Sequence, residues 1–250
     1  MNLKEMNVIV TGAASGLGRC FALNLAQAGA GVVAFDMNKE GLDALEAESD
    51  RIVGFVGSVT SEDDVKASVQ TCVEKFGAVH GVVNNAGIFR DGLLVRVDRK
   101  TGELHTMSLD DWNAVIDVDL TGPFLFAREV AAQMIRDNNG GVIVNISSCS
   151  RHGNRGQSNY SAAKAGLVAD TKLWGEELAK HGIRVGAVAP GFVQTPILDG
   201  MRPEMLEKMV SKVPLGRVAK PEEIFQAVRF IFECDYFTGR CIDVDGGITM

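Results

Sequence analysis

Short apolar segments alternate with helical patterns along nearly the whole of this 250-residue chain, and this alternation constrains the fold more than any other feature. Several of the apolar segments, such as VVAF and VIVNI, are continuously apolar, as in parallel strands that are covered on both faces. Repeated strand–helix units predict an α/β, doubly wound parallel sheet with helices on both faces, formed by one domain over residues 1–250. The expected strands are Asn7–Thr11, Gly31–Asp36, Ile52–Val56, Gly81–Asn84, Gly141–Ser147, Arg184–Ala189 and Cys241–Val244. The expected helices are Gly16–Ala28, Lys39–Ser49, Glu62–Phe76, Leu109–Asn138, Ser158–His181 and Pro221–Glu233.

Two segments interrupt the alternation. Ile88–Ser108 is long and polar, and the alternating patterns LLVRVD and ELHTM within it predict a β-hairpin that projects from the sheet. Phe192–Leu215 follows the carboxyl end of a strand, where ligands bind in such sheets, and it carries methionines at four-residue spacing. That spacing fits a short helix that either packs in the core or forms an apolar lid over a substrate. The three methionines are Met201, Met205 and Met209.

Composition and charge exclude several classes of function. The net charge of −7 argues against binding to nucleic acid or to an anionic membrane surface. No apolar run reaches the ~18 residues that a membrane span requires, and the first residues enter a strand pattern at once. The five cysteines are scattered and the four histidines show no metal-ligand spacing, so we expect reduced thiols, a cytoplasmic protein and no metal site.

A glycine-rich turn, Thr11-Gly-Ala-Ala-Ser-Gly-Leu-Gly18, directly follows the first expected strand and opens the first expected helix. Glycine permits a tight turn and lets the backbone approach a pyrophosphate group, which the positive end of a helix dipole attracts. The spacing of Gly12, Gly16 and Gly18 differs from the GxGxxG of larger dehydrogenases. The strand–turn–helix context nevertheless predicts a dinucleotide-binding site.

The end of the second expected strand predicts which dinucleotide binds. A carboxylate at Asp36 can accept both hydrogen bonds from an adenosine ribose diol and would repel a 2′-phosphate. Lys39 is the nearest cation in the sequence, so we expect NAD(H) rather than NADP(H). The turn Asn84-Asn-Ala-Gly87 ends the fourth expected strand, and its small residues leave room for the nucleotide.

Tyr160 and Lys164 lie four residues apart on an expected helix, so their side chains share one face. A phenol has a pKa near ~10 and is a poor acid or base at neutral pH, but a neighbouring ammonium lowers that pKa. The pair therefore indicates proton transfer in alcohol/ketone chemistry.

Six motifs occur together in one order: TGAASGLG, Asp36, NNAG, NISS, YSAAK and the segment Pro190–Thr195. In this combination the chain resembles the short-chain dehydrogenases/reductases over its whole length. The resemblance implies a Rossmann-type sheet of seven parallel strands, a nicotinamide cofactor, a small-molecule substrate and commonly a homotetramer. In that tetramer the helices that match Leu109–Asn138 and Ser158–His181 would pack against a second subunit.

The resemblance also implies roles for individual residues. Tyr160 would be the general acid/base, and Lys164 would lower its pKa and hold the nicotinamide ribose. Thr195 and the backbone of Val193 would bind the nicotinamide carboxamide. The other implied cofactor-binding residues are Gly12, Ser15, Gly16, Leu17, Gly18, Asp36, Ser58, Val59, Asn85, Ala86, Gly87, Pro190 and Gly191.

The serine that binds the substrate oxygen in the family has two candidates in this chain. It usually stands thirteen residues before the tyrosine, which selects Ser147, whereas the register of the NISS strand selects Ser148, twelve residues before Tyr160. We expect Ser148, with one residue deleted from the following loop, because burial sets strand register and loop length changes at little cost.

Two further positions depart from the family pattern. Asp119 stands where the family has a structural and proton-relay asparagine, and a carboxylate donates no hydrogen bond unless it is protonated. Either Asp119 is protonated or its partner is rearranged, and we expect activity to remain. Ser58 stands where an aspartate more often contacts the adenine amino group, and it would accept a weaker hydrogen bond.

The substrate is open to two interpretations. Similar-looking enzymes act on 3-oxoacyl or 3-hydroxyacyl thioesters of coenzyme A or of acyl carrier protein. The hairpin after NNAG resembles that of NAD-dependent 3-hydroxyacyl-CoA and hydroxysteroid dehydrogenases, whereas carrier-protein reductases usually take NADPH and their acidic carrier favours a basic rim. We therefore expect hydride transfer between NAD(H) and a 3-hydroxyacyl-CoA-type or other small hydroxy substrate, with 3-oxoacyl-acyl-carrier-protein reductase as the alternative.

Two other hypotheses remain open, one about the loop after Ser148 and one about the function of the chain. The loop contains Arg151, His152 and Arg155, and it is either an anion-binding surface or an ordinary solvated loop. The chain could also be a non-catalytic NAD(H)-binding sensor, although such a protein has no need of Tyr160 as an acid/base group.

Overall fold

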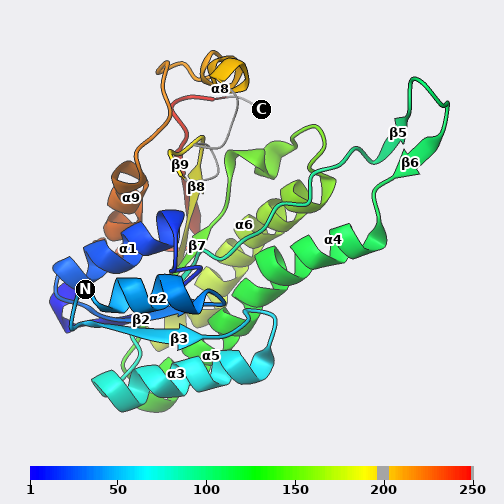
Figure 1. Cartoon of the computed structure of the whole chain (residues 1–250). Coiled ribbons are helices and arrows are strands. Elements are labelled where there is room, and N and C mark those ends of the chain that lie inside the picture. Colours follow the sequence, from blue (N-terminus) through cyan, green and yellow to red (C-terminus); the bar gives the residue numbers. More distant parts are fainter. Residues whose placement is uncertain (196–202, 249–250) are drawn as a thin grey trace.

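A computed structural model of the chain describes residues 1–195 and 203–248, and its centre is a seven-stranded parallel sheet (Figure 1). The strand order is β3-β2-β1-β4-β7-β8-β9, with every neighbouring pair parallel. This order confirms the predicted doubly wound α/β fold. The strands are β1 (Asn7–Thr11), β2 (Gly31–Asp36), β3 (Ile52–Val56), β4 (Gly81–Asn84), β7 (Gly141–Ile146), β8 (Ile183–Pro190) and β9 (Arg240–Val244).

Helices cover both faces of the sheet. Val8 and Val10 of β1 are buried in the layer of α1, α2 and α9, whereas Ile9 between them is buried in the layer of α3, α5 and α6. Buried side chains on both faces explain why the strand sequences are continuously apolar. The helices are α1 (Gly16–Gln27), α2 (Lys39–Glu46), α3 (Glu62–Phe76), α4 (Leu109–Ile116), α5 (Gly122–Asp137), α6 (Ser158–Leu178), α8 (Pro203–Val210) and α9 (Pro221–Glu233).

The expectation of one continuous helix over Leu109–Asn138 is wrong in the middle. A π-helical turn, Asp117–Thr121, separates α4 from α5, and the Gly122 N–H bonds back to the Asp117 carbonyl. The wider turn inserts a residue into the helical repeat, and such turns often mark functional sites. It places the side chain of Asp119 in the interior, where none of its surface is exposed.

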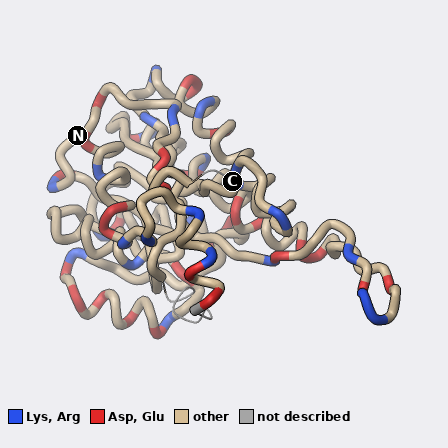
Figure 2. The backbone as a smooth tube through the Cα atoms, turned by 90° about the horizontal axis from the view of Figure 1, so that it is seen from above, with Lys and Arg blue, Asp and Glu red and all other residues tan. Residues whose placement is uncertain are grey.

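An antiparallel hairpin occupies the interrupting segment before α4. Its strands are β5 (Val95–Val97) and β6 (Leu104–Thr106), and Figure 1 shows them projecting from the body of the molecule. All six strand residues are exposed to solvent. Lysine and arginine gather at the tip, as Figure 2 shows. The hairpin therefore contributes nothing to the core of the chain that carries it.

The segment over 192–215 contains α8, which begins at Pro203. Met201 and residues 196–202 lie outside the described residues. Met205 is 46% exposed, so core packing within this chain does not explain that position. A lid over the substrate stays a prediction.

Within residues 1–195 and 203–248, no helix has the length and apolar character needed to cross a membrane. Within the same part of the chain no group of histidine, cysteine, aspartate and glutamate side chains is arranged to hold a metal ion.

Candidate active site

The glycine-rich turn lies at the carboxyl edge of the sheet, between β1 and the N-terminus of α1. Gly12 has a φ of +65°, and a Cβ there would lie 2.9 Å from the Ala86 Cα, so the turns after β1 and β4 are in direct contact. Asn85 joins them further, because its Nδ2 donates to the Thr11 carbonyl at 3.0 Å. The side chain of Asn85 is thus hydrogen-bonded to the glycine-rich turn, so the contact with the cofactor predicted for Asn85 would be made by its backbone.

The segment after β8 lies close to the N-terminus of α1. Gly16 has a φ of +53°, and a Cβ there would be in van der Waals contact with the Thr195 Cγ2 at 3.8 Å. Ser15 is the exposed N-cap residue of α1, and within the described residues its hydroxyl makes no capping hydrogen bond. A helix N-terminus with free amides and a free hydroxyl fits a pyrophosphate. The residues present therefore fit the dinucleotide that the sequence predicts.

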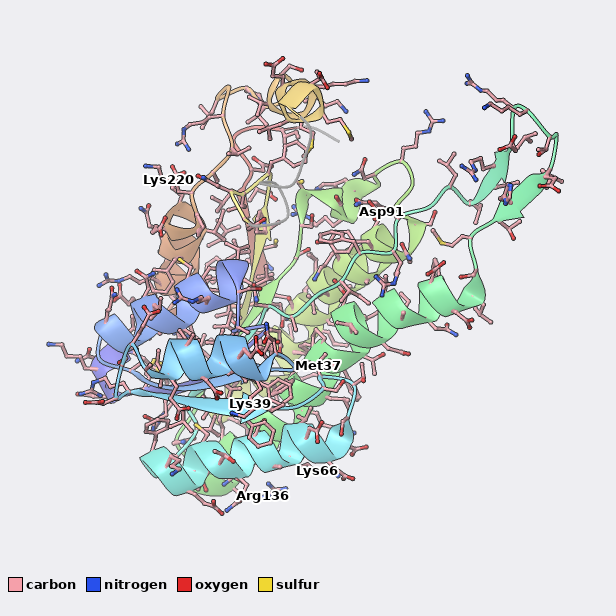
Figure 3. All side chains as sticks on the ribbon, in the orientation of Figure 1. Met37, Lys39, Lys66, Asp91, Arg136 and Lys220 are labelled. Atoms are coloured by element: carbon pink, nitrogen blue, oxygen red, sulfur yellow. The ribbon has the colours of Figure 1, made fainter. Side chains whose placement is uncertain are left out.

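The carboxylate of Asp36, at the end of β2, is held beside this turn. Its Oδ2 accepts the Ala14 N–H at 3.0 Å, and its Oδ1 accepts the Asn38 N–H at 2.9 Å. Lys39 does not reach toward this carboxylate, because its Nζ pairs with Asp43 at 2.7 Å on α2. Met37 and Lys39 are labelled in Figure 3. The Asp36 carboxylate thus forms no ion pair with Lys39, the nearest cation in the sequence.

Several of the remaining predicted cofactor residues follow the carboxyl ends of β3 and β8. Gly191 packs against Asp245, the residue after β9, since a Cβ there would lie 2.7 Å from the Asp245 Cα, and the Val193 side chain is buried. The Ser58 hydroxyl is bonded to the Thr60 hydroxyl at 2.8 Å, so it serves the turn before α3. Val59 and Pro190 are buried, and Leu17 is half-buried.

Tyr160 and Lys164 are brought together on α6 with a third group from the π-helical turn. The Lys164 Nζ lies 5.4 Å from the centre of the Tyr160 ring and 3.1 Å from the Asp119 Oδ2. It also donates to the Ile146 carbonyl at 3.1 Å, at the end of β7. The second Asp119 oxygen accepts the Ile88 N–H at 2.8 Å. One buried ion pair therefore joins α6, β7 and the segment after β4.

The structure separates the two candidate serines. Ser147 donates its hydroxyl to the Lys164 carbonyl at 2.9 Å, so this side chain points into the backbone of α6. The Ser148 hydroxyl accepts the Ser150 N–H at 3.1 Å and is close enough to Tyr160 to lower the pKa of the phenol. β7 ends at Ile146, one residue earlier than expected. Ser148 is the serine that shares the site with Tyr160.

The electrostatics of the site favour a protonated phenol. Burial is the main cause that raises the pKa of Tyr160, and the Asp119 charge raises it further. The Lys164 charge and the Ser148 hydrogen bond act in the opposite direction but are outweighed. Burial also disfavours the Lys164 ammonium, yet Asp119 and Tyr160 together raise the pKa of Lys164, which stays charged.

Two residues that contact Tyr160 were not predicted from the sequence, because neither stands in one of the recognised motifs. The Phe89 ring centre lies 4.6 Å from that of Tyr160 and covers one side of the phenol. Asn159 is buried, donates to the carbonyls of Arg90 and Asp111 at 3.1 and 3.0 Å, and accepts the Tyr160 N–H. It therefore fastens the start of α6 to the hairpin base and to α4.

The charged residues in the loop after Ser148 differ in burial and in their partners. Arg151 pairs with Asp243 of β9 at 2.6 Å and is mostly buried, so its charge already has a partner within the chain, and the hypothesis that it meets an anionic substrate stays untested. His152 and Arg155 are exposed. The solvated-loop interpretation fits both of them.

A doubly wound sheet with a dinucleotide-type turn and a serine–tyrosine–lysine group at its carboxyl edge defines a nucleotide-dependent oxidoreductase architecture. The family model described as "Enoyl-(Acyl carrier protein) reductase" matches residues 12–249. The chain belongs to the short-chain dehydrogenase/reductase family. It is an oxidoreductase of that family.

Several curated relatives match the whole length of the chain. A 3-oxoacyl-(acyl-carrier-protein) reductase of Thermotoga maritima is 44% identical over 257 aligned residues, which cover 100% of both chains. The enzyme of the same name from Synechocystis is 38% identical and covers 97% of this chain and 96% of its own. One from Staphylococcus aureus is also 38% identical, with 98% of each chain covered.

Proposed function

We propose that the protein reduces a 3-oxoacyl thioester, carried on acyl carrier protein, to the 3-hydroxyacyl thioester with NADH as the preferred cofactor. The names of the relatives support this alternative over the coenzyme A substrate that the sequence led us to expect. The observation that carries the reaction class is the position of the Lys164 ammonium, 5.4 Å from the centre of the Tyr160 ring and one turn away on the same helix.

The chain's own residues account for the proton chemistry. A nicotinamide cofactor bound along the glycine turn would supply hydride to the substrate carbonyl carbon. The Ser148 hydroxyl orients the carbonyl oxygen by a hydrogen bond, and Tyr160 donates its proton to that oxygen as charge develops. The Lys164 ammonium stabilises the phenolate that remains. Phe89 keeps water away from one side of the phenol.

The preference for NADH rests on Asp36. Its carboxylate is fixed by two backbone amides, and Lys39 is engaged by Asp43. A 2′-phosphate at this place would meet an uncompensated negative charge, whereas a ribose diol would meet a hydrogen-bond acceptor.

Initial rates test the proposal. The 3-oxoacyl thioester is presented on acyl carrier protein or on coenzyme A, each with NADH and with NADPH, and kcat/KM is compared over the four combinations. We expect the highest value for the carrier-protein substrate with NADH. Tyr160→Phe serves as the inactive control, with a loss of about two to four orders of magnitude in kcat and nearly unchanged NADH binding.

Other results of the same assay would select other functions. A higher kcat/KM for the coenzyme A thioester would support the second candidate, which the hairpin insertion and Asp36 favour. Tight NADH binding without turnover of either thioester, or of steroids, sugars and small diketones, would support the sensor and contradict the proposed reaction.

A further inference from the structure

Asp119 replaces an uncharged amide by a carboxylate in the most buried part of the site. Its side chain is 0% exposed and that of Lys164 is 4% exposed, and their charged atoms lie 3.1 Å apart. The sequence led us to expect Tyr160 as the partner of Lys164, and the structure adds Asp119 as a second partner. The lysine charge is therefore shared between two partners.

We propose that the buried Asp119 carboxylate offsets the charge of Lys164, so that Tyr160 keeps its proton in the free protein and is set to act as a proton donor. The Asp119 carboxylate is bonded to the Ile88 N–H and paired with Lys164, so it is a positioning residue that acts through Lys164.

Counting charges explains the effect. Asp119 and Lys164 together are neutral, so ionising Tyr160 would leave a net negative charge in a region sealed from water, which costs free energy. With asparagine at position 119, the ammonium and a phenolate would instead form a neutral pair. The carboxylate thus removes much of the driving force by which a neighbouring lysine makes a phenol acidic.

The other groups around Tyr160 do not supply a replacement charge. Cys149, on the turn after β7, has its pKa raised mainly by burial and stays a neutral thiol. Arg90 at the hairpin base and Asp111 on α4 present backbone carbonyls to Asn159, and both side chains are exposed. Apart from burial, the ionisation of the Tyr160 phenol therefore depends on Lys164, Asp119 and Ser148.

A directional consequence follows, and it rests on the proposed function. A tyrosine that holds its proton serves reduction of a ketone, where the phenol must donate. Oxidation of the alcohol needs a phenolate, which would require positive charge from the oxidised nicotinamide beside it. We therefore expect kcat/KM for reduction to stay constant with rising pH until Tyr160 loses its proton.

The chain offers a direct measurement, because Tyr160 and Tyr236 are its two tyrosines and Tyr236 is fully exposed. In a Tyr236→Phe protein without cofactor, the ultraviolet difference absorbance of tyrosinate reports Tyr160 alone. We expect its midpoint to lie above the ordinary value near ~10. A midpoint below that value would overturn the inference without any change in the site.

Asp119→Asn in the same background is expected to lower the midpoint by about one to three units. The matched control is Asp117→Asn, which removes an exposed carboxylate two residues away and should leave the midpoint unchanged. Circular dichroism establishes that each variant is folded, and Asp119→Ala provides a second neutral side chain if Asp119→Asn is unstable. An unchanged midpoint in a folded Asp119 variant would overturn the inference.

The titration uses neither substrate nor cofactor, so it separates the two proposals. A protein inactive on every thioester still reports the effect of Asp119 on Tyr160. Conversely, thioester reduction together with an unchanged midpoint would contradict the role of Asp119 alone.

Discussion

Ser147 and Ser148 show how two adjacent hydroxyls in one site differ in function. We expect Ser148→Ala to lower kcat/KM about ten- to a hundredfold, because the substrate oxygen loses a hydrogen-bond donor. Ser147→Ala removes a hydrogen bond to the Lys164 carbonyl and should lower the free energy of unfolding by about 1 kcal/mol with little change in kcat. Kinetics and thermal melts of both variants check this. A large kinetic loss in Ser147→Ala alone would show that the assignment is reversed.

Asp36 allows a second test at the same scale. Asp36→Asn keeps the shape and one acceptor oxygen but removes the charge that would oppose a 2′-phosphate. We expect the ratio of kcat/KM for NADH to that for NADPH to fall about tenfold or more. Asp50→Asn, an exposed carboxylate beyond α2, is the matched control and should leave the ratio unchanged. An unaltered ratio in Asp36→Asn would mean that another group selects the cofactor.

At the scale of elements, the hairpin of β5 and β6 is separable from the fold. Replacing residues 94–107 by a short Gly-Ser linker should change the free energy of unfolding by less than about 1 kcal/mol, because the strand residues are exposed and a shorter loop closes at lower entropic cost. Chemical denaturation measures the difference. A loss of several kcal/mol would show that the hairpin packs against something in solution.

The elements also show where sequence reasoning succeeds and where it stops. Strands such as β1 and β2 were predicted with their bounds because burial on both faces makes them continuously apolar. The sequence did not predict the π-helical turn, because its residues fit an ordinary helical pattern. The pairing of Asp119 with Lys164 that accompanies the turn is a contact between distant segments. Contacts between distant segments, such as Phe89 with Tyr160, carry no local pattern to recognise.

At the scale of the whole molecule, we propose that four chains associate, as the family resemblance implies. Phe124 and Ile135 of α5 and Leu173 of α6 are 43%, 40% and 49% exposed, which leaves apolar surface on two helices available for a second copy. Sedimentation equilibrium should give four times the chain mass of 26.8 kDa. A monomer at micromolar concentration would contradict the tetramer.

For the candidate site as a whole, the sequence predicted which residues take part better than it predicted which side chains pair with one another. The sequence identified Tyr160, Lys164 and Ser148, because each stands in a motif with a fixed relation to a strand or helix. The partners of these residues depend on side-chain packing, so the pairing of Asp119 with Lys164 and the engagement of Lys39 by Asp43 became visible only in three dimensions.

Gly87 imposes a constraint on how this chain can change through mutation. A Cβ at Gly87 would lie 2.8 Å from the Asp119 Oδ2, so even alanine there would push the carboxylate away from Lys164. Positions 87 and 119 are therefore coupled, although they lie far apart in the sequence, and the neighbouring Ile88 N–H donates to the same carboxylate. A larger side chain at position 87 is therefore expected to be tolerated better when position 119 carries a smaller side chain than aspartate.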